Sequence, residues 1–308
     1  MLPLSGALVP EPTADGSMTL FSTDFGEWFH SREGAYAEAI TTYVEATDLA
    51  TLAQAPTLVL LDVCYGLGYN TAAALSTITQ VNPHCQVHLM ALELDPRVPR
   101  QAVDANLING WPTAIQTCLA ELATAGQAYR PWLQAALLWG DARQRIQSLE
   151  QSGFQVDVIF FDPFSPPHCP ELWTVEFIQQ VARCLKPSGK LVTYSCAAAA
   201  RTAFQLAGLS IGPVKAAGRR WPGTLAQINP EGLAPLSLQA QDHLLTRAAV
   251  PYRDLTLADR AETIRQRRQQ EQMTSPLEPT SRWRQRWLPP QKKDPLAKTE
   301  PIRSSPLS

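Results

Sequence analysis

Short apolar runs that alternate with helical segments constrain the fold of this chain most strongly. Residues 57–63 read TLVLLDV, and runs of similar length follow at 87–93, 135–139, 156–161 and 190–194. Strands with apolar residues on both faces are typical of a parallel sheet that helices cover on both sides. We therefore predict an α/β fold with a mostly parallel sheet, in which ligands bind at the carboxyl ends of the strands.

The ends of the chain differ in composition from this middle part. Pro and Gly punctuate residues 1–17, which predicts a flexible N-terminus. Residues 18–257 form the predicted folded domain, and a polar helix is expected over 258–273. Pro is mixed with Lys, Arg and Ser over 274–308, which predicts a disordered basic tail.

Charge is distributed unevenly along the sequence. Residues 1–200 carry 9 Lys/Arg and 19 Asp/Glu, whereas residues 201–308 carry 17 Lys/Arg and 9 Asp/Glu. The first part has a net charge of −10 and the second a net charge of +8. A basic C-terminal portion suits contact with a polyanion, and a solvated charged tail explains the same pattern.

Composition excludes several classes of protein. Hydrophobic residues make up 45% of the chain, so wholesale disorder is excluded. No apolar run approaches the roughly 20 residues that a bilayer-spanning helix needs, and the first residues lack the basic start of a signal peptide. The six cysteines form no CxxC pair, and the five histidines show no metal-ligand spacing. We expect a cytoplasmic protein with no metal site and no membrane association.

A glycine-containing turn follows the first apolar run. Gly66 and Gly68 allow the backbone to turn tightly and to approach a ligand closely. The order of residues resembles the acid-x-Gly-x-Gly-x-Gly loop of S-adenosyl-L-methionine (AdoMet) methyltransferases, with Asp62 as the acid and Cys64 in place of the first glycine. A plain strand-to-helix turn is the alternative. The candidate cofactor-binding residues of this loop are Asp62, Tyr65, Gly66, Gly68 and Asn70.

Acidic residues also follow three later strands. Glu93 ends the second strand, where a carboxylate can accept the hydroxyls of a ribose. Asp141, with Ala142 beside it, follows the third strand and is placed to accept an adenine amine. Asp162 ends the run at 156–161. Each acid alone could cap a helix, but together with the glycine loop they are expected to share one edge of the sheet.

The loop that begins at Asp162 reads DPFSPPH and indicates the reaction. A residue before proline avoids the helical region, so Pro163 holds Asp162 extended at the strand tip. The carboxylate can then orient an amine and help to remove its proton, and Phe164 can lie against a flat base. Asp162 is the candidate catalytic residue, and a loop stiffened by proline with Asp162 as a helix cap is the alternative.

The sequence resembles the methyltransferase domain of MnmC, which completes 5-methylaminomethyl modification of the tRNA wobble uridine. It is most similar to stand-alone members that lack the FAD-dependent oxidase domain. The resemblance spans about residues 20–230 and rests on five segments. They are residues 28–34 (WFHSREG) with Ala37 and Glu38, residues 62–70, Glu93, residues 156–173 (VDVIFFDPFSPPHCPELW) and residues 218–225 (GRRWPGTL).

The resemblance implies a Rossmann-like methyltransferase fold, AdoMet as methyl donor without FAD or metal, and 5-aminomethyl(-2-thio)uridine in tRNA as acceptor. It implies that Gly66 and Gly68 lie against AdoMet, that Glu93 holds its ribose and Asp141 its adenine, and that Asp162 lies at the reacting amine. A separate oxidase or other modification enzyme would supply the aminomethyl group. The residues expected near the substrate are Ser31, Arg32, Glu33, Glu38, Pro163, Phe164, Arg219 and Arg220.

Two positions depart from the family pattern, because Cys64 and Pro163 stand where glycine is usual. Two other functions therefore stay open. A transferase of similar fold acting on a small amine would work without RNA. A non-catalytic RNA-binding scaffold that has lost AdoMet through Cys64 would bind tRNA but no cofactor.

Overall fold

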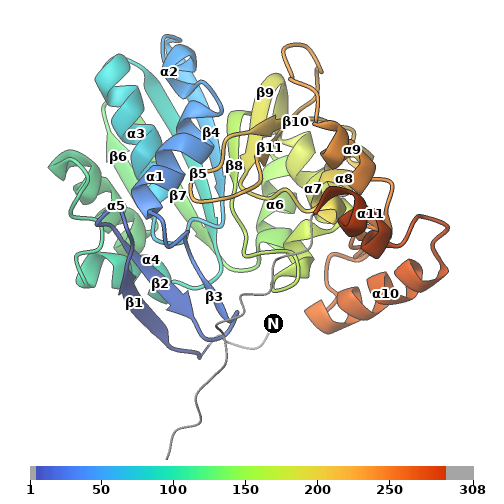
Figure 1. The fold of residues 1–308 in the computed structure, drawn as a ribbon. Coiled ribbons are helices and arrows are strands. Elements are labelled where there is room, and N and C mark those ends of the chain that lie inside the picture. The colour runs from blue at the N-terminus through green and yellow to red at the C-terminus, as the bar shows by residue number, and fades with distance from the viewer. Residues whose placement is uncertain (1–4, 289–308) are drawn as a thin grey trace, which may run out of the picture.

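A single eight-stranded sheet forms the centre of the computed structural model, which describes residues 5–288 (Figure 1). The five inner strands pair in parallel, and the strands beyond them pair antiparallel, so the predicted mostly parallel sheet is confirmed. From one edge to the other the strands are β10 (Ser210–Val214), β11 (Gly223–Gln227), β9 (Leu185–Thr193), β8 (Val156–Phe161), β4 (Thr57–Val63), β5 (Gln86–Glu93), β7 (Leu133–Trp139) and β6 (Gln127–Arg130).

The register of the inner strands brings their carboxyl ends to one line. Val63 at the end of β4 pairs with Leu92 of β5 on one side and with Phe161 of β8 on the other. Glu93 in turn pairs with Trp139 at the end of β7. The segments that follow these strands therefore share one edge of the sheet, as the order of the acidic residues predicts.

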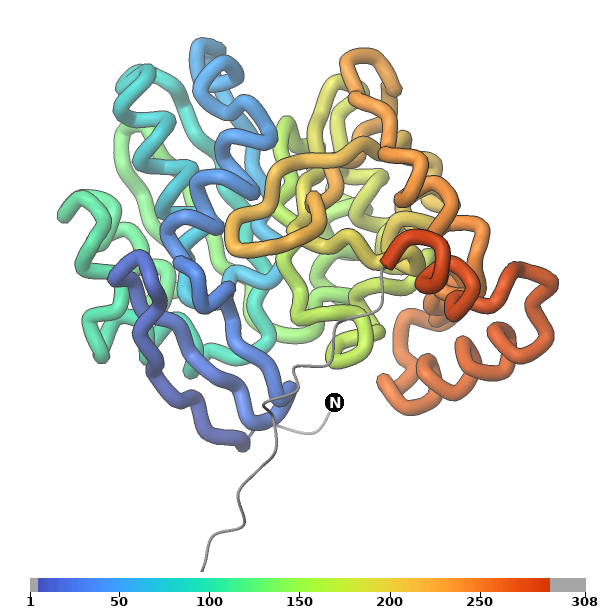
Figure 2. The backbone as a smooth tube through the Cα atoms, viewed as in Figure 1, coloured from blue at the N-terminus to red at the C-terminus, as the bar shows by residue number. Residues whose placement is uncertain are grey.

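Helices cover both faces of the sheet (Figures 1 and 2). They are α1 (Ala35–Glu38), the π-helix η1 (Ala39–Glu45), α2 (Leu49–Leu52), α3 (Tyr69–Val81), α4 (Arg97–Asp104), α5 (Thr113–Ala125), α6 (Ala142–Gln151), the 3₁₀ helix η2 (Pro170–Trp173), α7 (Val175–Arg183), α8 (Ala198–Leu206), α9 (Leu238–His243) and the 3₁₀ helix η3 (Arg247–Ala249). Alternate strand residues enter opposite cores, since Leu60 and Phe160 pack with η1, α3, α4 and α5, whereas Leu61 and Phe161 pack with α6, α7 and α8.

A separate three-stranded antiparallel sheet lies near the carboxyl edge of the main sheet (Figure 1). It contains β1 (Leu8–Pro12), β2 (Met18–Ser22) and β3 (Glu27–Trp28). The prediction of flexibility over residues 1–17 is therefore wrong for β1. Its two prolines are compatible with a strand because β1 is an edge strand, where a missing N–H donor is tolerated.

The C-terminal part adds two further helices, α10 (Ala261–Thr274) and α11 (Thr280–Trp287). Helix α10 lies where the sequence predicts a polar helix over 258–273. Trp283 of α11 is buried, stacks on His243 and donates its indole N–H to the carbonyl of Gln239 at 3.0 Å. The prediction of disorder over 274–308 is therefore wrong for α11, and its remainder over 289–308 lies outside the described residues. None of the helices within residues 5–288 has the length and apolarity needed to cross a membrane.

Candidate active site

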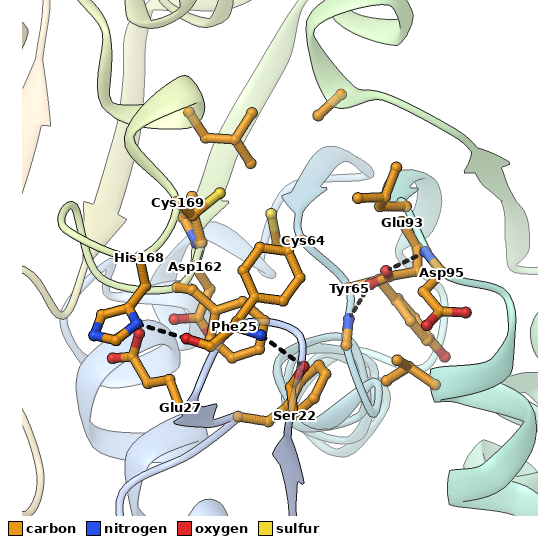
Figure 3. A pocket seen from close by; sticks show the side chains of 18 of the residues that line it. Ser22, Phe25, Glu27, Cys64, Tyr65, Glu93, Asp95, Asp162, His168 and Cys169 are labelled. Atoms are coloured by element: carbon orange, nitrogen blue, oxygen red, sulfur yellow. Dashed lines mark hydrogen bonds between the residues drawn. The ribbon is translucent and has the colours of Figure 1, made fainter. Parts of the chain in front are cut away.

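A cavity of about 330 Å³ opens at the carboxyl edge of the sheet. Its wall contains residues that follow β4, β5, β7 and β8, together with residues of the small N-terminal sheet and of α10. Figure 3 shows Glu93 and Asp162 on either side of the turn at Cys64 and Tyr65. The strand-end acids predicted to lie together, Glu93, Asp141 and Asp162, all line this cavity.

The turn after β4 depends on left-handed backbone conformations. The φ angles of Gly66 and Gly68 are 57° and 84°, and a Cβ atom on Gly68 would lie 2.5 Å from the hydroxyl oxygen of Tyr65. Cys64 also has a positive φ, 71°, which explains why glycine is favoured at this position. Gly66, Tyr65 and Cys64 line the cavity, whereas Gly68 begins α3 behind Tyr65 and does not reach the wall.

Glu93 holds this turn in place. One carboxylate oxygen accepts the backbone N–H of Gly66 at 2.8 Å, and the other accepts the N–H of Asp95 at 2.8 Å (Figure 3). Burial raises the pKa of Glu93 to about 7. Since each carboxylate oxygen has a second lone pair, Glu93 can support the loop and still accept hydroxyl groups from a ligand.

Asp141 both caps a helix and faces the cavity. Its carboxylate accepts the backbone N–H of Arg143 at 3.0 Å at the start of α6 and pairs with the Arg143 guanidinium at 2.7 Å. The structure therefore confirms that Asp141 caps a helix. The same carboxylate also lines the cavity, so the cap does not exclude a ligand contact. Ala142 lies beside it in the wall.

The expectation that Asp62 contacts the cofactor is not met by this geometry. Asp62 lies within β4, before the strand reaches the edge, and its side chain points into the sheet–helix interface instead of the cavity. It is completely buried and accepts the Thr71 hydroxyl of α3 at 2.7 Å. Burial raises the pKa of Asp62 to about 7. Its role in this structure is to tie β4 to α3.

Asp162 lies at the tip of β8, where two side chains donate hydrogen bonds to its carboxylate. The Tyr43 hydroxyl donates to one oxygen, and the Asn70 amide donates to the other at 2.8 Å. Burial, with the nearby charge of Glu38, raises the pKa of Asp162 to about 7. Asn70, predicted to bind the cofactor, lines the cavity and positions this acid.

Glu38 is a further acidic side chain in the cavity wall, near Asp162. It is almost completely buried, accepts the Ser31 backbone N–H at 2.7 Å and pairs with Arg219 at 3.4 Å. Burial raises the pKa of Glu38, although the charge of Arg219 opposes this change. The Arg219 guanidinium also stacks on the ring of Tyr194, 4.0 Å from its centroid.

Aromatic side chains line the cavity beside Asp162. Phe164 stacks on Phe25 with ring centroids 4.6 Å apart and contacts the edge of Phe29 at 4.9 Å. A hydrogen bond fixes the loop that carries Phe164, because the Tyr194 hydroxyl donates to the Pro163 carbonyl at 2.9 Å. Pro163 and Phe164 thus lie in the wall, as the sequence predicts for residues near a substrate.

Of the residues predicted near the substrate, Arg219 lines the cavity, whereas Ser31, Arg32, Glu33 and Arg220 lie outside its wall. Ser31, Arg32 and Glu33 form a turn whose backbone supports Glu38, and the Arg32 guanidinium lies over the ring of Trp28. A Cβ atom on Gly218 would lie 2.3 Å from the Ser31 hydroxyl, so the loop with Arg220 packs against this turn. These residues pack beside Glu38 of the wall, and their contacts with a substrate stay predictions.

Comparison with known proteins agrees with this geometry. A family profile described as S-adenosyl-L-methionine-dependent methyltransferase matches residues 100–229. An uncharacterized protein of Methanocaldococcus jannaschii is 30% identical over 255 residues, covering 80% of this chain and 67% of that protein. The crystal structure of MnmC2 from Aquifex aeolicus superposes with a TM-score of 0.77 and 29% identity, covering 89% of this chain and 87% of the other. This chain belongs to the MnmC-type methyltransferase family.

As a member of the MnmC-type family, the protein is an AdoMet-dependent methyltransferase with a Rossmann-like fold. The tRNA 5-methylaminomethyl-2-thiouridine biosynthesis bifunctional protein MnmC of Chromohalobacter salexigens is 26% identical over 71% of this chain. That match spans 33% of the relative's own length, so this chain corresponds to about a third of the bifunctional MnmC proteins.

The cavity fits the cofactor of the MnmC-type family. Its volume is within the range of about 300–1,000 Å³ usual for small-molecule sites. The Glu93 and Asp141 carboxylates are suitable acceptors for ribose hydroxyls and an adenine amine, and a Cβ on Gly66 would crowd Phe29 at 3.3 Å. Among residues 5–288, no group of three or more His, Cys, Asp or Glu side chains could hold a metal ion.

Several residues that line or support this cavity carry no signal in the sequence. Tyr43 lies on the π-helix η1, 119 residues before its partner Asp162, and no local motif marks it. Phe25, Tyr194 and Arg265 line the cavity itself. They come from the loop after β2, the segment after β9 and α10, and no spacing pattern joins them to Asp162, so only the folded arrangement identifies these contacts.

Proposed function

We propose that this methyltransferase methylates the primary amine of a 5-aminomethyl group on the wobble uridine of tRNA, forming the 5-methylaminomethyl group. The observation that carries the proposal is the placement of Asp162. Its carboxylate lies in the cavity wall, is oriented by Tyr43 and Asn70, and has Glu38 close enough to affect its pKa.

The position and raised pKa of Asp162 suit an amine nucleophile. An alkylamine resembles the lysine side chain, whose pKa is about 10.4, and is mostly protonated at neutral pH. It must lose a proton before its nitrogen can form a bond to a methyl carbon. Asp162, with a pKa raised to about 7, can hold the ammonium group as a carboxylate and accept its proton more readily than an ordinary aspartate.

The remaining chemistry follows from binding and orientation. When bound, AdoMet supplies a methyl group activated by its positively charged sulfur. Tyr43 and Asn70 occupy one lone pair on each Asp162 oxygen, which fixes the direction in which the carboxylate accepts a further hydrogen bond. Holding the amine in a fixed position contributes much of the rate in such a transfer.

The cavity and its surroundings suit an unpaired base on a nucleic acid. Phe164, Phe25 and Phe29 offer aromatic surfaces against which a pyrimidine can lie. Arg219 and Arg220 are carried on one loop that packs against the turn at Ser31, where guanidinium groups can meet phosphate. The net charge of +8 over residues 201–308 agrees with a polyanionic partner.

The substrate itself is proposed from the family. The curated MnmC relatives carry tRNA 5-methylaminomethyl-2-thiouridine biosynthesis in their names, and this chain matches about a third of their length. Another enzyme, such as a separate oxidase, would then produce the aminomethyl group.

The proposal is tested in two steps with the purified protein. Calorimetric titration with AdoMet first establishes cofactor binding. Transfer of a labelled methyl group is then measured on tRNA that carries 5-aminomethyluridine, on the same tRNA with unmodified uridine, and on free methylamine or spermidine. We expect transfer only to the aminomethylated tRNA. Equal transfer to a small amine without RNA, or AdoMet binding without any transfer, would contradict the proposal.

Two variants test whether Asp162 acts on the acceptor amine. Asp162→Ala should abolish transfer while leaving the Kd for AdoMet unchanged, because the acid acts on the acceptor. Asp157→Ala is a matched control, since Asp157 lies on the same strand but pairs with Lys186 away from the cavity. Full transfer by the folded Asp162→Ala variant would exclude Asp162 as the base.

A further inference from the structure

Helix α10, in the C-terminal part of the chain, reaches the wall of the cavity. Ala261 and Arg265, in its first turns, line the same cavity as Asp141 and Ala142. The Arg265 guanidinium donates to the carbonyl of Pro167 at 3.0 Å, in the loop that follows Asp162. The family profile ends at residue 229, so these wall residues lie beyond the part of the chain that it matches.

A buried ion pair connects this arm of the chain, residues 250–274, to the acid at the end of β7. Arg143 pairs with Asp141 at 2.7 Å and with Asp254 at 2.9 Å, and it also donates to the Asp259 carbonyl at 2.8 Å. Asp254 is completely buried, and Arg143 is 5% exposed. The pair thus joins the arm to an acid of the cavity wall, and removing either partner would leave a buried charge uncompensated.

Further contacts within the arm fix the orientation of α10. Arg267 pairs with Asp259 at 2.7 Å and donates to the carbonyl of Arg253, and Ile264 is completely buried in the core beside α6–α8. The neighbouring Arg265 lies on the side of the helix that faces the cavity. Its position in the wall is therefore set by the packing of the arm.

We propose that the arm is part of the cofactor-binding site and that Arg265 forms the outer wall at the adenine end. Two features place it there. It lines the cavity together with Asp141, the acid expected to accept the adenine amine, and with Glu171 and Leu172 of η2, against which α10 packs. A guanidinium is planar and stacks on flat rings, and adenine presents such a ring. The inference rests on AdoMet as the family's cofactor and is independent of the acceptor proposed above.

Binding measurements on the full-length protein test this role. Arg265→Ala should weaken S-adenosylhomocysteine about five- to tenfold in calorimetric titration, the effect expected for one cation–π or stacking contact. The same loss should occur with 5′-methylthioadenosine, which keeps the adenine and ribose but lacks the amino-acid carboxylate. Gln266→Ala is the matched control, because Gln266 is the exposed neighbour on α10 and should bind both ligands as the unmodified protein does.

The outcomes separate the possible roles of this arginine. An unchanged Kd for both ligands would overturn the proposal. A loss for S-adenosylhomocysteine alone would place Arg265 at the carboxylate end and would also overturn it. Arg265→Lys keeps the charge and removes the planar group, so it should regain only part of the affinity lost in Arg265→Ala, and full recovery would refute stacking. If Arg265→Ala does not fold, the Lys variant decides the question.

Discussion

Replacing Asp162 by asparagine should stabilise the protein above pH 7 and abolish methyl transfer. In the folded protein the pKa of Asp162 is raised from the usual 3.8 to about 7. Between these values the folded state keeps the proton that the unfolded chain has lost. The stability contributed by this carboxyl is therefore complete below about pH 4 and is lost as the pH rises through 7.

The size of the effect follows from the difference between the two pKa values. At about 1.4 kcal/mol per pKa unit, the complete loss amounts to about 4 kcal/mol. Part of it has already occurred at pH 5, so the variant should gain about 2–3 kcal/mol over the unmodified protein between pH 5 and pH 8. Asparagine has no charge to bury, and its amide can still bond to Tyr43 and Asn70.

Urea unfolding followed by circular dichroism at pH 5 and pH 8 measures this difference. Ionic strength should be equal at both pH values, and the slopes of the transitions should agree between proteins. The control, Asp157→Asn, alters an acid on the same strand outside the cavity and should not gain stability at pH 8. A stability difference for Asp162→Asn that is the same at both pH values would refute the reasoning.

Three further predictions follow from the same geometry. Glu93→Ala should raise the Kd for AdoMet at least about tenfold, because charge-assisted hydrogen bonds contribute about 1.5–3 kcal/mol. An unchanged calorimetric Kd in a folded variant would show that Glu93 does not bind AdoMet. Cys64→Gly should be at least as stable as the unmodified protein, because a φ of 71° costs a side chain about 1–2 kcal/mol. Cys64→Val should be less stable than the unmodified protein, because a β-branched side chain is even less compatible with a positive φ, and equal melting temperatures of the three proteins would contradict this strain. Trp283→Ala should lower the unfolding free energy by about 3 kcal/mol in urea titrations, because it removes the buried contact of α11 with His243. An unchanged unfolding transition would mean that this contact of α11 contributes nothing to stability.

The acids that the sequence predicts at one edge of the sheet, and that the structure brings into one cavity, lie at or just after the ends of single strands. Glu93, Asp141 and Asp162 are predictable because each ends or follows an apolar run, and parallel strands place such residues at one edge. The same reasoning fails for Asp62. That residue precedes the end of β4, and the alternation of side chains in a strand turns it toward Thr71 of α3 instead of toward the cavity.

The sequence by itself determines the α/β class, the inner strands and the edge at which they end, because apolar periodicity and turn residues are local properties. It does not determine which distant side chains complete the site. Tyr43 meets Asp162 across 119 residues, Arg143 meets Asp254 across 111, and the N-terminal strand β1 forms by pairing with β2 instead of by its own composition. These contacts are decided only when the packed sheet brings the segments together, because their stability comes from burial and pairing that no isolated segment has.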